Sequence, residues 1–222
     1  MVFDFFDEIR VVNLPTRRDR RARMLGELRK VGLENDPRVA FFDALTFANA
    51  DSFSSRGARG AFHSQLEILE QAAQRRHSVL ILEDDLDFIK GAQTYELEGD
   101  WAIFYGGYYA DDPKNLQKSD IVGAHMMGFS ADIVPKVAAY LRSLQFTGTH
   151  PPIDGAYVWF RRENPDVTTL FARPPLGNQR PSRSDIADLR FYDKFPVLKQ
   201  GMSIVRSAKR ALSNFFRPSL LN

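Results

Sequence analysis

The chain has 222 residues, of which 44% are hydrophobic and 26% charged, and its net charge at pH 7 is only +2. This length and composition predict one folded domain with a substantial core and exclude a disordered chain. The small net charge gives no case for a nucleic-acid partner, and the absence of cysteine excludes disulfides and thiolate zinc sites.

The first eight residues contain Asp4, Asp7 and Glu8 but no basic flank and no long apolar run. A signal peptide needs both features, so none is expected here. No other stretch approaches the roughly 18 apolar residues that a membrane span requires. With the lack of cysteine, these observations predict a cytoplasmic location.

Strand and helix patterns alternate along the chain. A β-branched run at residues 9–14 stops at Pro15, and a capping-box pattern at Thr16 and Asp19 then opens a helix whose apolar spacing ends at Gly32. Alternation of this kind predicts an α/β fold with a mostly parallel sheet, whose ligand site lies beyond the carboxyl ends of the strands. Further strands are predicted at 39–42, 79–82, 101–105 and 121–129, and further helices at 66–73 and 133–144.

The strongest chemical signal is an acidic triplet, Glu83-Asp84-Asp85, directly after the apolar run at 79–82. Adjacent carboxylates repel one another unless a cation or several donors offset their charge. Hard oxygen ligands suit Mn²⁺ or Mg²⁺, shared with the diphosphate of a bound nucleotide. The alternative is that these acids only end a strand and begin the next helix.

Residues 11–21 read Val-Val-Asn-Leu-Pro-Thr-Arg-Arg-Asp-Arg-Arg, a strand that ends in Asn-Leu and enters an arginine-rich helix start. This segment resembles the opening of glycosyltransferase family 25, which acts in lipopolysaccharide biosynthesis. Two positions depart from it, because Ala61 stands where the family often has cysteine, and Gln65, not His63, falls at its histidine position. His125 lies in a matching block. The other similar blocks keep the order of the family and extend the likeness over about residues 9–190: 59–66, 79–85, 123–130, 152–154 and 179–186.

The resemblance implies a GT-A-like, Rossmann-type fold, a UDP-sugar donor, a divalent metal, and transfer of a hexose such as galactose with inversion. The acceptor would be a glycan or glycolipid of the bacterial surface, such as lipopolysaccharide. In an extended segment Asp85 and Glu83 would both face the ligand, which makes them the first candidate metal ligands. Asp84 would point away, and it is counted with the candidate nucleotide-binding residues. Asp185 is a further candidate metal ligand or, alternatively, a helix N-cap.

Inverting transfer needs a base to take the proton of the acceptor hydroxyl, and Asp154 is the candidate. It follows Pro151-Pro152 and precedes a helix-like segment at 155–159. An N-cap at this helix would explain the aspartate equally well.

For the donor nucleotide, Asn13 at the first strand end could contact base or ribose, and Arg17 or Arg20 the diphosphate. Asp43, after the second strand, is a weaker candidate. The arginines could instead form a solvated helix face. The aromatic stretch at 104–109 suits either an acceptor wall or the core.

The last part of the chain has a composition of its own, because no acidic residue follows Asp193. We therefore divide the chain into a glycosyltransferase-like domain, 1–195, and a basic amphipathic tail, 196–222. In the tail, apolar residues from Met202 to Phe216 fall on one helical face, with basic residues beside it. This pattern is typical of a helix that lies on anionic lipid, which would make the protein peripheral to the inner face of a membrane. A helix folded back on its own domain is the alternative.

Two other function classes compete with a glycosyltransferase. A metal-dependent nucleotidyltransferase also collects carboxylates at strand ends, but it would need a glycine-rich phosphate loop, which the sequence lacks. A catalytically silent sugar-nucleotide or glycan-binding domain with the same fold is the second alternative, since a fold does not establish an activity.

Overall fold

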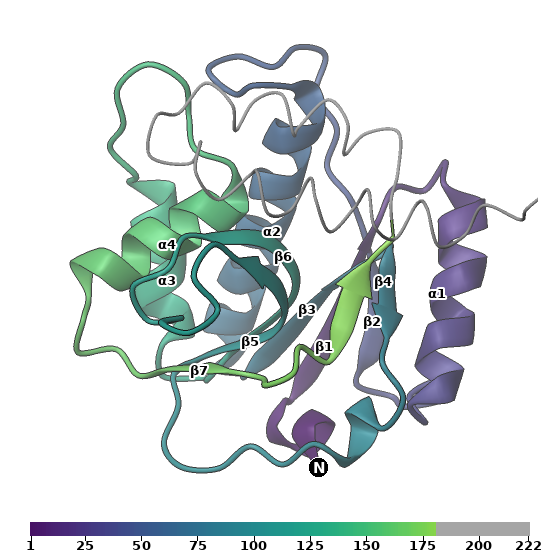
Figure 1. The fold of residues 1–222 in the computed structure, drawn as a ribbon. Helices are drawn as coiled ribbons and strands as arrows, with labels where there is room; N and C mark the ends of the chain where they lie inside the picture. Colours follow the sequence, from purple (N-terminus) through teal and green to yellow (C-terminus); the bar gives the residue numbers. More distant parts are fainter. Residues whose placement is uncertain (181–222) are drawn as a thin grey trace, which may run out of the picture.

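A computed structural model describes residues 1–180 of the chain (Figure 1). Asp185 and the basic tail, 196–222, lie outside the described residues. Within the described part no helix is both long and apolar enough to cross a bilayer.

A six-stranded sheet forms the centre of the described part, in the order β2-β1-β3-β6-β5-β7. β1 runs parallel to both β2 and β3, and β5 runs parallel to β7. β6 alone is reversed, because it pairs antiparallel with β3 and with β5. The predicted α/β class with a mostly parallel sheet is therefore confirmed. The strand bounds are β1 Glu8–Asn13, β2 Val39–Asp43, β3 Val79–Glu83, β5 Ile103–Ala110, β6 Ile121–Phe129 and β7 Thr169–Phe171.

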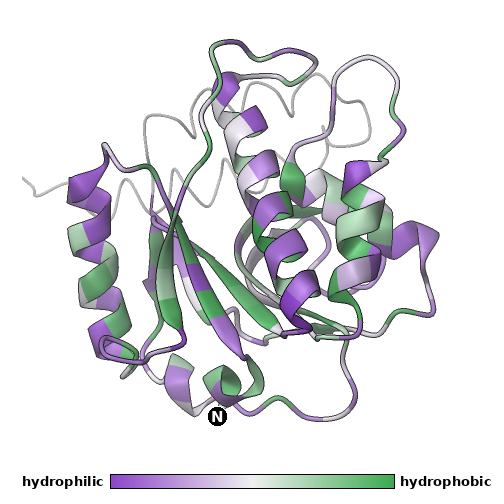
Figure 2. Ribbon diagram, turned by 180° about the vertical axis from the view of Figure 1, so that it is seen from behind, coloured by the Kyte–Doolittle hydropathy of each residue, from purple (hydrophilic) through white to green (hydrophobic). Residues whose placement is uncertain are grey.

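Helices cover both faces of this sheet. α2 packs with α3 and α4 on one face, and α1 lies with the short strand β4 on the other (Figure 1). Hydrophobic residues gather on the central strands, and hydrophilic residues on the outward helix surfaces (Figure 2). The helices are α1 Arg18–Lys30, α2 Arg56–Arg75, α3 Val134–Arg142 and α4 Ile153–Glu163, with single 3-10 turns at Val2–Phe5 and Ala92–Thr94.

The apolar side chains of β3 are buried on both faces of the sheet. Val79 and Ile81 pack in the core under α2, α3 and α4, while Leu80 and Leu82 pack in the core beneath α1. All four side chains are fully buried. A strand that is apolar at every position is the pattern of a central strand with helices on both sides.

A second, two-stranded sheet pairs β4 (Leu86–Phe88) antiparallel with β8 (Gly177–Gln179). β4 follows the acidic triplet after a two-residue turn, and β8 is the last strand of the described part. This pairing brings the segment around residue 180 back to the acidic turn, so it places residues far apart in sequence at one site.

Two local predictions need correction, and one pair of alternatives is decided. Helix α1 has Arg17, not Thr16, as its N-cap and no side-chain capping bond, because Arg17 N–H closes a turn onto the Leu14 carbonyl and shifts the helix start. α2 begins at Arg56, ten residues before the pattern at 66–73 indicated, because Ser55 is its N-cap and the Ser55 hydroxyl accepts the N–H of Ala58. The stretch at 104–109 belongs mainly to the core, since Phe104, Tyr105 and Tyr108 are buried.

Candidate functional site

A cleft of about 460 Å³ lies at the carboxyl ends of the parallel strands β1, β2 and β3. This is the position at which open α/β sheets bind ligands, and the volume is within the usual range for small-molecule sites. The amino-terminal turns of α1 and α2 complete its walls. The lining residues are Val12, Leu14, Arg20, Ala44, Leu45, Thr46, Phe47, Arg56, Gly57, Gly60, Ala61, Glu83, Asp84, Asp85 and Gln179.

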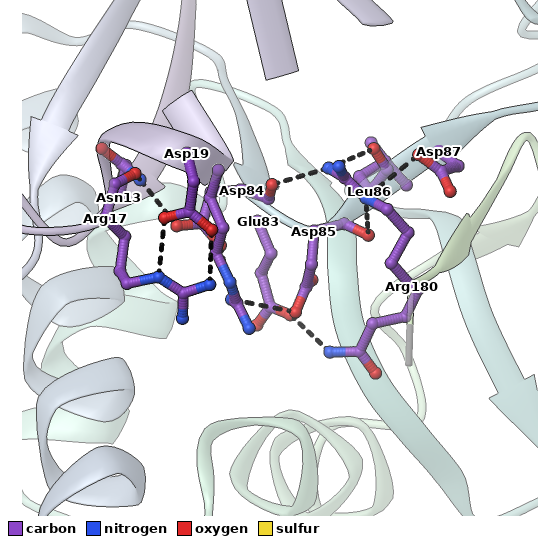
Figure 3. A network of polar contacts seen from close by, with 11 residues as sticks. Asn13, Arg17, Asp19, Glu83, Asp84, Asp85, Leu86, Asp87 and Arg180 are labelled. Carbon is purple, nitrogen blue, oxygen red and sulfur yellow. Dashed lines mark hydrogen bonds and ion pairs between the residues drawn. The ribbon is translucent and has the colours of Figure 1, made fainter. Parts of the chain in front are cut away.

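All three carboxylates of the triplet line this cleft. The prediction that Asp84 points away is wrong, because β3 ends at Glu83 and residues 84–85 form a turn, so the alternation of an extended strand stops there. Asp84 and Asp85 are each only 6% exposed. Figure 3 shows the three side chains at this turn.

Arg20 of helix α1 offsets the negative charge of the acidic turn. Nη1 of Arg20 donates to Oδ1 of Asp84 at 2.7 Å and to Oδ2 of Asp85 at 3.2 Å. Burial acts to lower the pKa of the Arg20 guanidinium, but the hydrogen bond to Asp84 and the charges of both carboxylates outweigh it and raise that pKa. Nδ2 of Asn13 donates to the other oxygen of Asp84 at 2.7 Å.

Two residues from the end of β8 complete the site. The Arg180 N–H donates to the Asp85 carbonyl and its Nη2 to the Asp84 carbonyl, both at 2.8 Å, and its guanidinium pairs with Asp87 at 3.1 Å (Figure 3). Nε2 of Gln179 donates to Oε2 of Glu83 at 3.1 Å. Arg180 thus fixes the backbone of the turn. Sequence reasoning missed both roles, and the only signal was the family block that begins at Gln179.

The predicted donor-binding residues separate into two groups. Arg20 and Asp84 line the cleft. Asn13 is buried and donates to Asp84, while Arg17 is part-exposed and forms a two-bonded ion pair with Asp19. Asp43 is exposed beside Asn13 in the strand register and is not among the lining residues. Arg17 thus lies at the N-cap of α1 and pairs locally, and the alternative of a solvated helix face does not describe Arg20, which lines the cleft.

Asp154 lies in the first turn of α4 and is 6% exposed. Its Oδ2 accepts the backbone N–H of Gly123 in β6, and its Oδ1 accepts the N–H of Gly155, both at 2.8 Å. Pro152 is the N-cap, so the alternative reading of Asp154 as the cap is wrong. Asp154 is not one of the residues lining the cleft described above, and its role as a base stays a prediction.

His125 and Gln65 both make interactions inside the fold. His125 is fully buried in β6, where its Nε2 lies 3.2 Å from the Gly177 carbonyl, and burial lowers its pKa to about 4. The ring is therefore neutral near pH 7. Gln65 is buried in α2, and its Oε1 accepts the hydroxyl of Tyr157 at 2.9 Å.

The donor set of the cleft fits a metal shared with a ligand rather than one held by the protein alone. Carboxylate oxygens of Glu83 and Asp85 are the hard ligands that Mn²⁺ and Mg²⁺ prefer, and Mg²⁺ is commonly held by one or two carboxylates together with phosphate oxygens. Among residues 1–180 no three histidine, aspartate or glutamate side chains are grouped so as to hold a metal by themselves. Phosphate oxygens would have to complete the coordination.

No protein-family model matches the sequence, and no curated protein matches it. Solved structures do share the fold. A glycosyltransferase involved in the glycosylation of the major capsid of PBCV-1 superposes with a TM-score of 0.51 at 10% identity, over 82% of this chain and 97% of that one. The described part of the chain therefore has a GT-A-like fold.

Two further structural neighbours are more distant. A glycosyltransferase of Streptococcus pneumoniae TIGR4 has a TM-score of 0.44 at 9% identity, over 91% of this chain and 64% of that one. The CTP:phosphocholine cytidylyltransferase of Streptococcus pneumoniae has a TM-score of 0.43 at 9% identity, over 82% of this chain and 96% of that one.

Proposed function

We propose that this protein is a metal-dependent, inverting glycosyltransferase that moves a hexose such as galactose from a UDP-sugar to a hydroxyl of a bacterial surface glycan such as lipopolysaccharide. The observation that carries the proposal is the placement of the acidic triplet. Glu83, Asp84 and Asp85 line a ligand-sized cleft at the carboxyl ends of parallel strands, in a GT-A-like fold. The resemblance to family 25 supports the choice of donor and acceptor.

The cleft has the charges that a nucleoside diphosphate requires. Arg20 and Arg56 line it and can donate to phosphate oxygens, because a guanidinium offers several N–H groups in a planar fork. Arg20 already lies between two carboxylates, so it is held where a diphosphate and a metal would meet. Glu83 and Asp85 would hold Mn²⁺ or Mg²⁺, with Asp185 as a candidate from outside the described residues. The bound metal would offset the charge that develops on the leaving diphosphate.

The chemical step would form a bond between the acceptor oxygen and the anomeric carbon while the bond to the diphosphate breaks. Asp154 would take the proton of the attacking hydroxyl. Attack opposite to the leaving group inverts the anomeric centre, so an α-linked UDP-hexose would give a β-linked product.

A catalytically silent sugar-nucleotide or glycan-binding domain is the second candidate, and the two ion pairs of Arg20 favour it. Arg20 offsets Asp84 and Asp85 within the fold, so the triplet has a structural explanation that needs no metal. The two candidates differ in whether a cation strengthens nucleotide binding and whether a product forms.

Isothermal titration of the full chain with UDP, with and without Mn²⁺, tests the proposal. We expect binding that is markedly tighter with Mn²⁺, and release of UDP from UDP-galactose when a glycan acceptor is supplied. Metal-independent binding without turnover would favour the silent domain, and no binding of UDP under either condition would end the proposal. An α-linked product, identified by its anomeric proton coupling, would contradict inversion.

A further inference from the structure

The loop after β2 forms an apolar wall of the cleft. Ala44, Leu45, Thr46 and Phe47 are consecutive lining residues, and Phe47 is the one aromatic side chain among the lining residues given above. Phe47 is only half-buried. Part of an aromatic surface therefore lies beside a cleft whose other walls carry carboxylates and guanidinium groups.

The backbone of this loop is fixed against helix α2. The N–H of Leu45 donates to the hydroxyl of Ser64 at 2.8 Å, and that hydroxyl donates to the carbonyl of Gly60 at 2.7 Å. Gly60 permits the approach, because a Cβ at this position would stand 2.5 Å from the Leu45 carbonyl oxygen. Ser64 is fully buried. These contacts give the wall one defined position before any ligand arrives.

The ring of Phe47 is held in place as well. The guanidinium carbon of Arg59 lies 4.2 Å from the ring centroid, and Nη1 of Arg59 donates to Oδ1 of Asn49 at 2.6 Å, which ties the arginine to the same loop. The ring of His63 packs at 5.0 Å between centroids. Because Arg59 and His63 already hold the ring, Phe47 loses little side-chain freedom when a ligand covers its exposed part. Such preorganisation favours affinity.

We propose that Phe47 is the platform on which the base of the donor nucleotide stacks. The inference rests on the proposed function, and it assigns the two chemical parts of a nucleotide to two walls of the cleft. The diphosphate belongs with Arg20 and the carboxylates at the end of β3. The planar base belongs on Phe47, because every base has a π-face that gains by stacking on an aromatic ring and by leaving water.

A stacking platform has a selective effect that a merely structural phenylalanine lacks. It strengthens binding of every ligand with a base, whichever base that is, and it contributes nothing to a ligand without one. UDP, CDP and pyrophosphate, each with Mn²⁺, therefore separate the base from the diphosphate. UDP carries no hexose, so its use also separates base stacking from stacking of a sugar ring.

The experiment measures dissociation constants of these three ligands, and of UDP-galactose, for the full chain and for Phe47→Ala, Phe47→Leu and Phe47→Tyr. We expect Phe47→Ala to weaken UDP and CDP by about 5- to 150-fold and to leave pyrophosphate within about twofold. Phe47→Leu keeps an apolar side chain in the wall and should also lose affinity for UDP, whereas Phe47→Tyr keeps the ring and should retain it. Phe5→Ala, at an exposed phenylalanine before β1, is the matched control.

Three results would overturn the inference. The first is unchanged UDP affinity in Phe47→Ala and Phe47→Leu. The second is an equal loss for UDP and pyrophosphate, which would mean that the wall collapses. The third is a loss seen with UDP-galactose but not with UDP, which would assign the ring to the sugar. Failure of the parent protein to bind UDP would instead show that the proposed function is wrong, and the inference would fall with it.

Discussion

Arg20 is the residue on which the charge balance of the site depends. The side chain of Arg20 is 16% exposed, and the side chains of Asp84 and Asp85, which it bridges, are each 9% exposed. Ion pairs of this depth are screened less by water than surface pairs, and the loss of one partner leaves the other charged and buried. The Arg20 guanidinium therefore has a structural role in addition to any role in binding.

Arg20→Gln should lower the free energy of unfolding by about 2–4 kcal/mol in metal-free buffer, because Asp84 and Asp85 would then repel each other without a nearby guanidinium. Urea denaturation measures this change, and added Mn²⁺ should restore stability more in the variant than in the parent. Arg17→Gln is the control, since the solvent-exposed Arg17–Asp19 ion pair should contribute little to stability. Equal losses in the two variants would contradict the assignment.

Asp85→Asn should abolish the part of UDP binding that depends on Mn²⁺, since it removes a proposed metal ligand. The melting temperature of the metal-free protein should stay the same or rise, because one of two neighbouring carboxylates is neutralised. Titration calorimetry and a thermal melt are the measurements. Asp132→Asn, at an exposed aspartate that does not line the cleft, is the control and should bind UDP normally. A variant at Asp85 with parental Mn²⁺-dependent affinity would exclude it as a ligand.

Asp154→Asn should retain donor binding but lose transfer by roughly 10²- to 10⁴-fold, the usual contribution of a general base. The amide oxygen of asparagine can still accept the N–H of Gly123, but its NH2 group then faces the N–H of Gly155, so a thermal melt checks that the variant is folded. The measurements are the UDP dissociation constant and the turnover number. Turnover at the parental rate would remove Asp154 from the mechanism.

At the scale of elements, His125 links the central sheet to the strand that closes the site. Its ring in β6 contacts the carbonyl of Gly177 in β8, and β8 leads to the two residues that hold the acidic turn. A protonated ring would be buried against the Gly177 carbonyl and the Tyr109 ring, and its desolvation would be costly. The fold therefore requires neutral His125.

This requirement predicts a loss of stability in mild acid. The pKa of His125 is about 4 in the folded protein against 6.5 ordinarily, so the unfolded chain takes up a proton first as the pH falls. The free energy of unfolding should decrease between about pH 6.5 and 4, by as much as about 3 kcal/mol from this residue. Urea denaturation across that range should show a shallower slope for His125→Gln, whose amide can still donate to Gly177. Burial lowers the pKa of His63 and His150 as well, so a His63→Gln variant gives the comparison. Identical pH profiles for parent and His125→Gln would contradict the prediction.

At the scale of the whole molecule, the division into residues 1–195 and a tail at 196–222 stays a prediction, because the tail lies outside the described residues. If the tail lies on a membrane, truncation after Phe195 should release the protein from vesicles that contain anionic lipid. Each basic residue near the surface should contribute about 1 kcal/mol, and added salt should weaken binding. Sedimentation with vesicles of phosphatidylcholine and phosphatidylserine measures this effect.

The alternative, a tail docked on its own domain, predicts a different result for the same truncation. Loss of buried apolar surface would lower the melting temperature and leave vesicle binding unchanged. A thermal melt beside the sedimentation assay therefore decides between the two. Unchanged sedimentation with a lowered melting point would end the membrane hypothesis.

The class of the fold and the position of the acidic turn can both be predicted from the order of residues along the chain. Residues 79–82 are apolar at every position, which is the pattern of a strand covered on both faces, and the carboxylates follow it directly. Both features are local, since they depend on the order of neighbouring residues along the chain. The same local reasoning failed at Asp84, because the chain turns there and the alternation of a strand no longer applies.

The partners that meet at the site, by contrast, depend on how distant elements pack. Arg20 reaches Asp84 across 64 positions of sequence, and Arg180 reaches it across 96. Phe47 enters the cleft because Gly60 and Ser64, on another element, hold its loop. No local spacing encodes such contacts, since they depend on how the helices pack on the two faces of the sheet and on the pairing of β4 with β8. The carboxylates can be located at a strand end from the sequence alone. The packing of distant elements brings Arg20, Arg180 and Phe47 to them.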